Sequence, residues 1–440
     1  MDLKIQKENY GKILLIGASV LMWLLIIILF KTYGYERTWQ LWKVPTQNMT
    51  FMDFRLIPGS AESFANGFEP SVENPYDPNG RIFNYPAFWR LFFYTGITQA
   101  DTVWISVFMI VLFFVSVFFF PERPSIPAVV GMLAVLFSPA SMLLYERGNV
   151  DLIVFVICVI IVLAAKYSAY AASLIILFGG IVKLFPVLGL SVLLKESKKK
   201  FLWLSFVCLL VLVAYMLATW DSVQASWTLT MRGDGASYGT NVFATRYGQA
   251  ISRAFSAWFT SSQIEFFLNY GFMIAALVLL LLVILLSVRR PVFSEPAASR
   301  NFDAFRMGAS IYVGTFLLGN NWDYRLAFLV LVVPQLVDWM RYSVKTIRAA
   351  AWLSMLLALL STWHFWIAEI PLMSGFGSVE DSRKFWIILD ETFNWMLFAS
   401  LAYLLFISAP EWLQKPFRNF LVKEKSQSPP GHGQTNHPLS

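Results

Sequence analysis

Runs of about 20 apolar residues recur from one end of the chain to the other, which is the length at which an α-helix crosses a ~30 Å hydrocarbon layer. Of the 440 residues, 57% are hydrophobic and 14% are charged, whereas soluble domains carry about 25% charged residues. The sequence therefore predicts an all-α integral membrane protein.

We expect a polytopic bundle of about 12 transmembrane helices. The predicted spans are residues 13–30, 102–120, 126–144, 150–165, 169–181, 184–194, 201–219, 264–287, 306–318, 326–340, 348–367 and 388–408. The three spans between residues 150 and 194 are short. The first run follows three lysines, as a signal peptide does, but it lacks a small-residue cleavage site, so we expect a retained helix.

The Lys and Arg residues predict how the chain is oriented, because they are enriched in cytoplasmic segments. With the N-terminus inside, the inner segments, including KESKKK at residues 195–200, carry most of the 34 Lys and Arg. This distribution explains the net charge of +7 without a nucleic-acid partner. Residues 31–100 then form a long first extracytoplasmic loop, and residues 220–263 form a second large outer loop. The aromatic residues of both loops are typical of a membrane interface and also suit the apolar faces of sugars.

Residues 1–420 are expected to form a single membrane domain, and residues 421–440 a disordered cytoplasmic tail, because the polar composition of the tail cannot form a core. Two of the three histidines lie in this tail, and both cysteines, Cys158 and Cys208, lie in apolar runs. A disulfide framework, a zinc site and a His-based catalytic triad are therefore not expected. We expect no metal and no cofactor.

Four polar clusters interrupt the apolar runs on the predicted outer side. They are MDFRL with Asp53 and Arg55, YERGNVDL at residues 145–152, VKLFP with Lys183, and GNNWDYRL at residues 319–326. Ionisable groups at the end of a span are costly unless they are paired or functional. Both explanations remain open for these clusters.

Local pairing is the first explanation. Arg147 and Asp151 lie four residues apart and can pair along one helix face, and Asp323 can pair with Arg325. The Gly-Asn pair within YERGNVDL can mark a turn that caps the next helix.

Convergence on a ligand is the second explanation. Arg147, Lys183 and Arg325 end three different hairpins on the face that carries the long loop, and converging cations form an anion site that suits phosphate. A phosphate at membrane depth usually belongs to a lipid, which indicates a polyprenyl phosphate. Asp53 is then a candidate base beside it.

The order of these motifs, together with NPY and FNYPAFW near the end of the first outer loop, resembles glycosyltransferase family 87 over about residues 10 to 410. These are polyprenyl-phosphate-sugar-dependent transferases of the GT-C superfamily, related to mycobacterial phosphatidylinositol mannosyltransferases. The resemblance implies a GT-C-like bundle in which an aspartate of the first extracytoplasmic loop is the catalytic base, and Asp53 matches it. Pro58 and Gly59 depart from the continuous, aromatic-rich helix expected after Asp53.

The implied function is a membrane glycosyltransferase in the plasma (inner) membrane that acts on the extracytoplasmic side. It would move a hexose, mannose by default, from a polyprenyl-phosphate-sugar donor to a lipid-linked or glycan acceptor. A monophosphate donor needs no metal, because Arg and Lys can stabilise its leaving group, and the chain has no D-x-D motif. One carboxylate beside a cationic rim fits an inverting transfer with a general base better than a two-carboxylate hydrolase.

The residues predicted to form this site fall into three groups. Asp53 is the catalytic residue, and Arg147, Lys183 and Arg325 bind the donor phosphate. The predicted sugar-binding or acceptor-binding residues are Arg55, Tyr85, Asn149, Asp151, Asn321, Asp323 and Tyr324. Within YERGNVDL, Arg147 is expected to face the phosphate and Asp151 to orient it.

Two other classes of protein remain as alternatives. A transporter or flippase of lipid-linked saccharides is expected to show internal repeats or matching broken helices, and GGIVKLFP has no clear partner elsewhere in the sequence. A ligase or polymerase of lipid-linked glycans is expected to have its largest outer loop late in the chain, whereas here the largest loop comes early.

Overall fold

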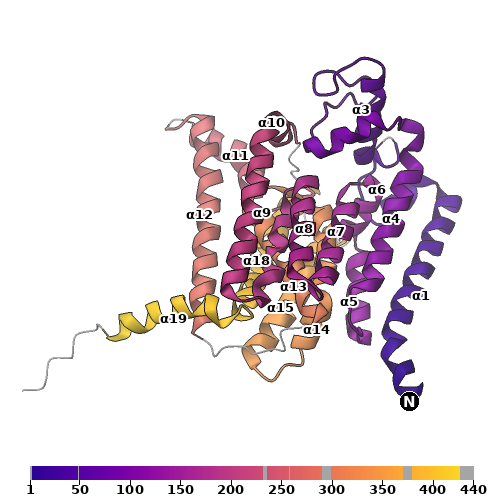
Figure 1. The fold of residues 1–440 in the computed structure, drawn as a ribbon. Helices are drawn as coiled ribbons and strands as arrows, with labels where there is room; N and C mark the ends of the chain where they lie inside the picture. Colours follow the sequence, from indigo (N-terminus) through magenta and orange to yellow (C-terminus); the bar gives the residue numbers. More distant parts are fainter. Residues whose placement is uncertain are drawn as a thin grey trace, which may run out of the picture.

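The structure of the chain, a computed structural model, describes residues 2–47, 49–230, 235–256, 258–289, 299–369 and 379–426. Its helices form one bundle (Figure 1). The helices of the first half are α1 (Asp2–Tyr33), α2 (Tyr35–Leu41), α3 (Met52–Ala65), η1 (Ala87–Tyr94), η2 (Gln99–Asp101), α4 (Thr102–Phe119), α5 (Ile126–Leu136), α6 (Pro139–Arg147), α7 (Asp151–Ala165), α8 (Ala169–Val182), η3 (Phe185–Lys195) and α9 (Lys198–Ala218).

The second half of the chain is built in the same way. Its helices are α10 (Trp220–Leu229), α11 (Val242–Ala254), α12 (Ser261–Val288), α13 (Arg300–Leu317), η4 (Asp323–Leu331), α14 (Val333–Trp339), α15 (Lys345–Thr362), α16 (His364–Ile367), α18 (Val379–Ile407) and α19 (Glu411–Ser426). The strands of the described chain are β1 (Ser237–Tyr238) and β2 (Asn321–Trp322), of two residues each. The predicted all-α class is therefore confirmed.

Four helical segments are long and apolar enough to cross a membrane: Tyr10–Tyr33 in α1, Gln99–Phe119 around α4, α9, and Ser262–Val288 in α12. Two bent pairs raise the number to six if each pair is one span. These are α5 with α6, bent by 52°, and Phe385–Ile407 with Glu411–Asn419, bent by 102°. By length and composition, the described residues therefore hold four to six spans, and the predicted number of about 12 is not confirmed.

The remaining predicted spans are too short, too polar or broken. Helices α7, α8 and η3 have 15, 14 and 11 residues, whereas an α-helix needs about 20 residues to cross the hydrocarbon layer. Helix α13 begins with the charged sequence RNFDAFR, and the span predicted at residues 326–340 is divided between η4 and α14. Apolar runs of this kind predict buried helices as readily as spans.

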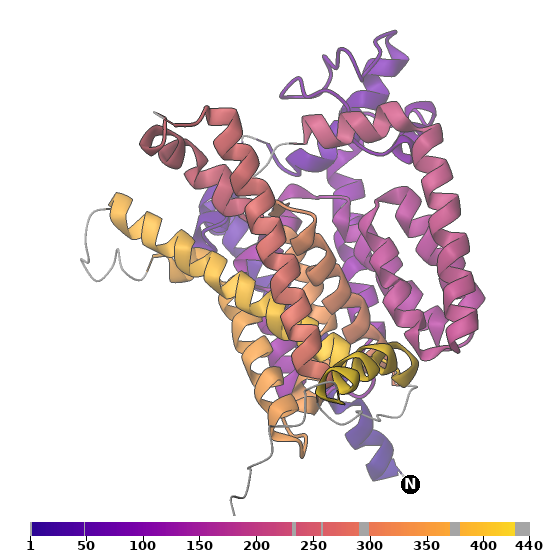
Figure 2. The same ribbon diagram turned by 90° about the vertical axis from the view of Figure 1, so that its left-hand side faces the viewer.

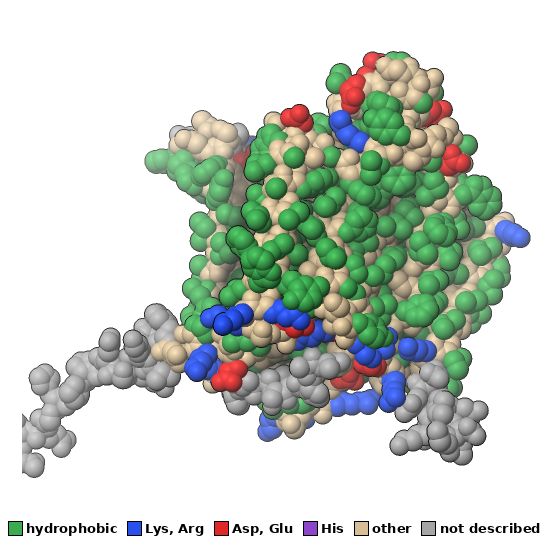
Figure 3. Space-filling view, viewed as in Figure 1, with side chains coloured by type: hydrophobic (Ala, Val, Ile, Leu, Met, Phe, Trp, Pro, Cys, Tyr) green, Lys and Arg blue, Asp and Glu red, His purple; other side chains and the backbone are tan. Residues whose placement is uncertain are grey.

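The surface of the bundle is apolar between its two ends. Trp203 and Phe206 of α9 are 61% and 58% exposed, and hydrophobic side chains cover the middle of the face seen in Figure 3. A protein surrounded by water rarely exposes apolar surface on this scale. The exposed apolar residues therefore fit helices that contact lipid.

The two ends of the bundle differ in charge. Figures 1 and 2 place α3 at one end and the start of α1 together with α19 at the other. Lys and Arg side chains gather in a band at the end that carries the start of α1 (Figure 3). This arrangement fits the predicted separation of a basic side from the side of the long first loop.

Aromatic rings fill much of the core around α7. The ring of Phe155 lies 4.4 Å from that of Phe113 on α4 and 5.3 Å from that of Phe328 on η4, measured between centroids. The α7 residues that follow Asp151 are apolar and mostly buried. This packing fixes the first turn of α7, and therefore Asp151, at the end of the bundle nearest α3.

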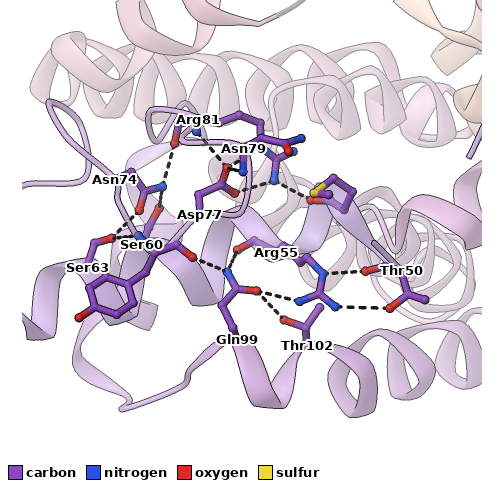
Figure 4. A network of polar contacts seen from close by, with 12 residues as sticks. Thr50, Arg55, Ser60, Ser63, Asn74, Asp77, Asn79, Arg81, Gln99 and Thr102 are labelled. Atoms are coloured by element: carbon purple, nitrogen blue, oxygen red, sulfur yellow. Dashed lines mark hydrogen bonds and ion pairs between the residues drawn. The ribbon is translucent and has the colours of Figure 1, made fainter. Parts of the chain in front are cut away.

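Polar contacts hold the long first loop together around α3 (Figure 4). The buried side chain of Asn74 donates to Ser60 Oγ at 3.1 Å and accepts from Ser63 Oγ at 2.7 Å. Helix α3 continues through Pro58 and Gly59. A Cβ at Gly59 would lie 2.5 Å from Gln99 Nε2 and 2.9 Å from Tyr76 O, so the glycine allows the loop to pack closely on the helix.

The strands β1 and β2 connect the second outer loop to the turn before η4. They pair antiparallel, with Ser237 opposite Trp322 and Tyr238 opposite Asn321. The chain approaches itself closely beside this pair, because a Cβ at Gly239 (φ 130°) would lie 1.5 Å from Gly319 O. In the predicted second loop, residues 231–234 and 257 lie outside the described residues. Of the predicted disordered tail, residues 421–426 instead belong to α19, and the rest lies outside the described residues.

Candidate functional site

A cavity of about 1010 Å³ lies beside the start of α3. The start of α3, the turn between α6 and α7, the turn between α8 and η3, and β2 with the start of η4 bring polar side chains to its wall. The predicted residues on this wall are Asp53, Tyr85, Arg147, Asn149, Lys183, Asn321, Tyr324 and Arg325. The structure therefore brings together residues that are far apart in the sequence.

Asp53 lies in the first turn of α3, directly against the turn that follows α6. Phe51, which precedes α3, has a left-handed backbone (φ 57°), and its N–H donates to Glu146 O at 3.2 Å. Asn149 Nδ2 donates to Asp53 Oδ2 at 2.7 Å, and Asn149 Oδ1 accepts from the N–H of Asp151 at 3.0 Å. Asn149 therefore accepts a bond from the first residue of α7 and also orients the Asp53 carboxylate, whereas the N-cap position of α7 is Val150 and has no side-chain cap bond.

Asp151 lies behind the cavity wall and holds two of the predicted cations. Lys183 Nζ is 2.5 Å from Asp151 Oδ1, and Arg325 Nε is 3.2 Å from Asp151 Oδ2. The Asp151 side chain is completely buried. A second group of Arg325, Nη1, donates to Asn321 Oδ1, and Asn321 itself is held by the β1–β2 pair. Both cations are therefore fixed in place on the cavity wall.

Arg147 is arranged differently from the other two cations. Its Nε is 3.2 Å from Glu146 Oε2, and its Nη2 donates to Pro45 O at 3.1 Å. The predicted pairing of Arg147 with Asp151 is therefore wrong, because Asp151 is used by Lys183 and Arg325. Asp151 orients those two cations and not Arg147. Glu146 is fully buried and also accepts from Tyr35 Oη at 2.9 Å.

Besides Asp151, two predicted site residues lie away from the cavity wall. Arg55 donates to Thr50 O at 2.8 Å and to Gln99 Oε1 at 3.0 Å, so it stabilises the loop (Figure 4). Asp323 does not pair with Arg325, because its Oδ2 lies 3.3 Å from His364 Nε2. Burial raises the pKa of Asp323 to about 7, and the neighbouring His364 partly offsets this effect.

Several residues of the site were not predicted from the sequence. Arg81 lines the cavity, pairs with Asp77 at 2.7 Å and donates to Met52 O at 2.6 Å, so it fixes the residue before Asp53. The sequence feature that could have indicated Arg81 is its spacing from Asp77 in DPNGR, near the aromatic end of the first loop. Gln47 also lines the cavity, and no motif in the sequence indicates it. Tyr85 was predicted, and burial together with the Asp53 charge raises the pKa of its phenol, which therefore stays protonated.

Charge is unevenly distributed over the cavity wall. Arg81 and Arg147 are each balanced by a carboxylate of their own. Lys183 and Arg325 share a single carboxylate, so this pair is the only group with excess positive charge among the described residues of the wall. Asp53 is the one described carboxylate on the wall and accepts from a neutral amide. The cavity therefore presents one cationic centre and one carboxylate.

Another part of the wall carries apolar side chains, together with polar ones such as Tyr215, Ser226 and Asn269. It comes from α8, α9, α10, α12 and the end of α13, and it includes Ile181, Leu184, Met216, Val223, Trp227, Met273, Leu317 and Leu318. Helices α9 and α12 are two of the helices that are long and apolar enough to cross a membrane. The cavity thus combines a charged part with an apolar part next to helices that are long and apolar enough to cross a membrane.

The fold and the cavity together define an all-α protein that has helices long and apolar enough to cross a membrane and a polar site at one end. Compared with protein-family models, curated protein sequences and solved structures, the chain gives no significant match. Within the described ranges, the structure contains no group of three or more His, Cys, Asp or Glu residues that could hold a metal ion.

Proposed function

We propose that the protein is a membrane glycosyltransferase that moves a hexose from a polyprenyl-phosphate-sugar donor to a lipid-linked or glycan acceptor. The observation that carries this proposal is the presence, in one cavity, of a carboxylate, a cationic centre with excess charge and an apolar wall. Mannose is the default sugar. The site is proposed to face the extracytoplasmic side of the plasma (inner) membrane.

Lys183 and Arg325 would hold the donor phosphate. Their shared carboxylate, Asp151, is buried behind them and leaves one positive charge uncompensated. A fixed cationic centre stabilises the charge that develops on a departing phosphate, because it needs no rearrangement during the reaction. In this assignment Arg147, whose charge Glu146 balances, has no direct role in binding the phosphate.

Asp53 would act as the general base. Its carboxylate takes the proton of the acceptor hydroxyl while the hydroxyl oxygen bonds to the anomeric carbon. The bond from that carbon to the phosphate oxygen breaks, and the polyprenyl phosphate leaves with the electron pair. A single displacement of this kind inverts the anomeric centre. Asn149, which donates to Asp53 at 2.7 Å, orients the carboxylate for the proton transfer.

The apolar part of the cavity supports a lipid-linked donor. Its residues lie on α9, α10, α12 and α13, beside helices whose outer faces are exposed and apolar. A polyprenyl chain can occupy this part while its phosphate reaches Lys183 and Arg325. Water-soluble sugar nucleotides would leave this apolar surface unused.

The proposal is tested with purified protein in lipid nanodiscs and a panel of labelled polyprenyl-phosphate hexoses. We expect labelled glycoside from the wild type. Asp53→Asn is expected to reduce turnover by about 10²–10⁴-fold, the usual effect of losing a positioned base, with unchanged thermal stability. Asp221→Asn, an exposed carboxylate of α10 outside the cavity wall, is the matched control and should retain activity.

Two results would contradict the proposal. Full turnover of Asp53→Asn would exclude Asp53 as the base. In proteoliposomes, movement of the labelled lipid across the bilayer without any glycosidic product would instead indicate a transporter.

A further inference from the structure

We propose that Arg147 and Gln47 form a subsite for an uncharged sugar of the acceptor, so that the acceptor is recognised through hydroxyl groups and not through a phosphate. This inference rests on the proposed function and deepens it by naming the class of acceptor. Both residues lie on the cavity wall, and neither is needed to hold the donor phosphate.

The first observation is that the charge of Arg147 is already balanced. Glu146 is fully buried, and its Oε2 lies 3.2 Å from Arg147 Nε. The same carboxylate accepts from the N–H of Gln47 at 3.5 Å, and Pro45 O accepts from Arg147 Nη2. The segment from Pro45 to Gln47 therefore packs against an ion pair that has no net charge. An anionic ligand gains little from a cation whose charge is already compensated by a fixed carboxylate.

The second observation is that polar atoms of this cluster lack hydrogen-bond partners; among the described residues these include Glu146 Oε2, which keeps its ion pair with Arg147 Nε. Within the part of the chain that the structure describes, Nη1 of Arg147 and Oε1 of Gln47 are buried and form no hydrogen bond. Arg147 is only 9% exposed. Buried polar atoms nearly always have partners, so an unpaired donor and an unpaired acceptor beside a cavity indicate a ligand that supplies both.

The chemistry of these two atoms specifies that ligand. A guanidinium N–H can only donate, and an amide oxygen can only accept. A hydroxyl group does both, so it can accept from Arg147 and donate to Gln47. A phosphate ester or a carboxylate offers only acceptors and would leave the Gln47 oxygen unpaired. Neighbouring hydroxyl groups of a sugar therefore fit this pair better than an anionic head group.

The position of the cluster fits the acceptor side of the reaction. The N–H of Phe51, two residues before Asp53, donates to the backbone of Glu146, and Asn149 connects the same turn to the Asp53 carboxylate. The charge of Asp53 acts on both Glu146 and Lys183. A base must contact the acceptor hydroxyl, so the cluster beside Asp53 that does not hold the phosphate is the place for the acceptor.

The test compares a neutral probe with a charged one. Butyl hexopyranosides and their phosphorylated counterparts are offered as acceptors to the protein in nanodiscs, and binding of each probe is also measured directly by saturation-transfer NMR. We expect the neutral glycosides to bind and to be glycosylated. Gln47→Leu, which removes the oxygen at nearly constant volume, should weaken neutral-probe binding and raise its KM by about 10-fold, with the donor KM unchanged.

Two further variants complete the test. Gln40→Leu is the matched control, because Gln40 is exposed on α2 and its side-chain amide donates to Glu36 at 3.1 Å, outside the cavity wall. Glu146→Gln removes the compensating charge, so we expect it to increase the relative use of the phosphorylated probes. A purely structural effect of Gln47→Leu would change thermal stability and donor KM as well.

The outcomes separate the two proposals. Preference of the wild type for phosphorylated probes, or unchanged neutral-probe binding in Gln47→Leu, would overturn the subsite while leaving the transferase intact. Absence of any transfer or donor hydrolysis would contradict the proposed function. In that case, binding of neutral glycosides that depends on Gln47 would still support the subsite.

Discussion

The side chain of Asp151 determines how the two cations of the cavity behave. Buried and 0% exposed, it contacts Lys183 at 2.5 Å and Arg325 at 3.2 Å. Without it, two like charges would face each other, and removing one partner of a buried ion pair typically costs about 3–5 kcal/mol. Asp151 therefore stabilises the site although it does not itself line the cavity.

Arg325 can be tested by a substitution that keeps its charge. Arg325→Lys retains one positive charge but loses the planar group that reaches Asp151 and Asn321 at the same time. We expect donor KM to rise or turnover to fall by about 10- to 100-fold, since bidentate contacts of arginine are not reproduced by lysine. Steady-state kinetics with varied donor measure this effect.

Arg300→Lys provides the control for this prediction. Arg300 pairs with Glu122 at 3.7 Å, outside the cavity wall, and its replacement should leave donor kinetics unchanged. Equal kinetics for wild type and Arg325→Lys would show that the guanidinium does not contact the donor.

Single residues also show where prediction from the sequence succeeds and fails. Asp53, Lys183 and Arg325 were expected to converge because apolar runs place turns at span ends, and the cavity brings them together. Their partners could not be predicted, because Asp151 is 32 residues from Lys183 and 174 from Arg325. Spacing of four residues favoured a pair between Arg147 and Asp151, but tertiary contacts determine the partners.

At the scale of elements, the β1–β2 pair controls the position of the Arg325 turn. Asn321 belongs to β2 and accepts from Arg325, and the N–H of Asp323 donates to Ala236 O at 2.9 Å. These contacts attach the second outer loop to the turn that holds Arg325. This contact connects segments about 80 residues apart, which hydropathy alone does not reveal.

Gly239→Ala should disrupt the contact between the second outer loop and the turn before η4. A Cβ there would overlap Gly319 O, and the φ of 130° is unfavourable for alanine. We expect a lower thermal midpoint and loss of transfer activity, measured on the purified protein. Gly248→Ala in α11 is the control, because its Cβ would meet nothing closer than 4.0 Å and alanine favours helices. Normal activity of Gly239→Ala would show that this contact is not required for transfer.

The number of spans depends on which helices could contact lipid and which are buried among other helices. The periodic apolar runs predicted helices correctly, but hydropathy does not distinguish a helix that contacts lipid from one buried among other helices. Helix α7 is an example, since it has only 15 residues and most of its side chains are buried. The short helices of the bundle interior therefore inflated the predicted number of spans.

Across the bundle as a whole, two features separate the basic segment from the cavity. The basic KESKKK segment precedes α9, whose 21 residues extend about 30 Å at 1.5 Å per residue. Near the other end of α9, Tyr215 Oη accepts from the N–H of Phe88 in the first loop. The basic segment and the cavity therefore lie at opposite ends of the bundle.

Cysteine labelling tests which end faces outward. Val72→Cys lies in the first loop, where Val72 is 75% exposed, and Lys199→Cys lies in the basic segment. In intact cells, a membrane-impermeant maleimide should label the first variant, and it should label the second only after permeabilisation. The native cysteines Cys158 and Cys208 are buried and serve as the background. Labelling of both variants in intact cells would refute the orientation.

The sharing of Asp151 by Lys183 and Arg325 has a consequence for turnover. This cationic centre is assembled within the fold and does not depend on the sugar being present. Under the proposed function, the spent carrier lipid keeps both its phosphate and its chain after the hexose has left. It would therefore compete with fresh donor for the same place, and the rate of the enzyme would depend on how quickly the cell recycles that carrier.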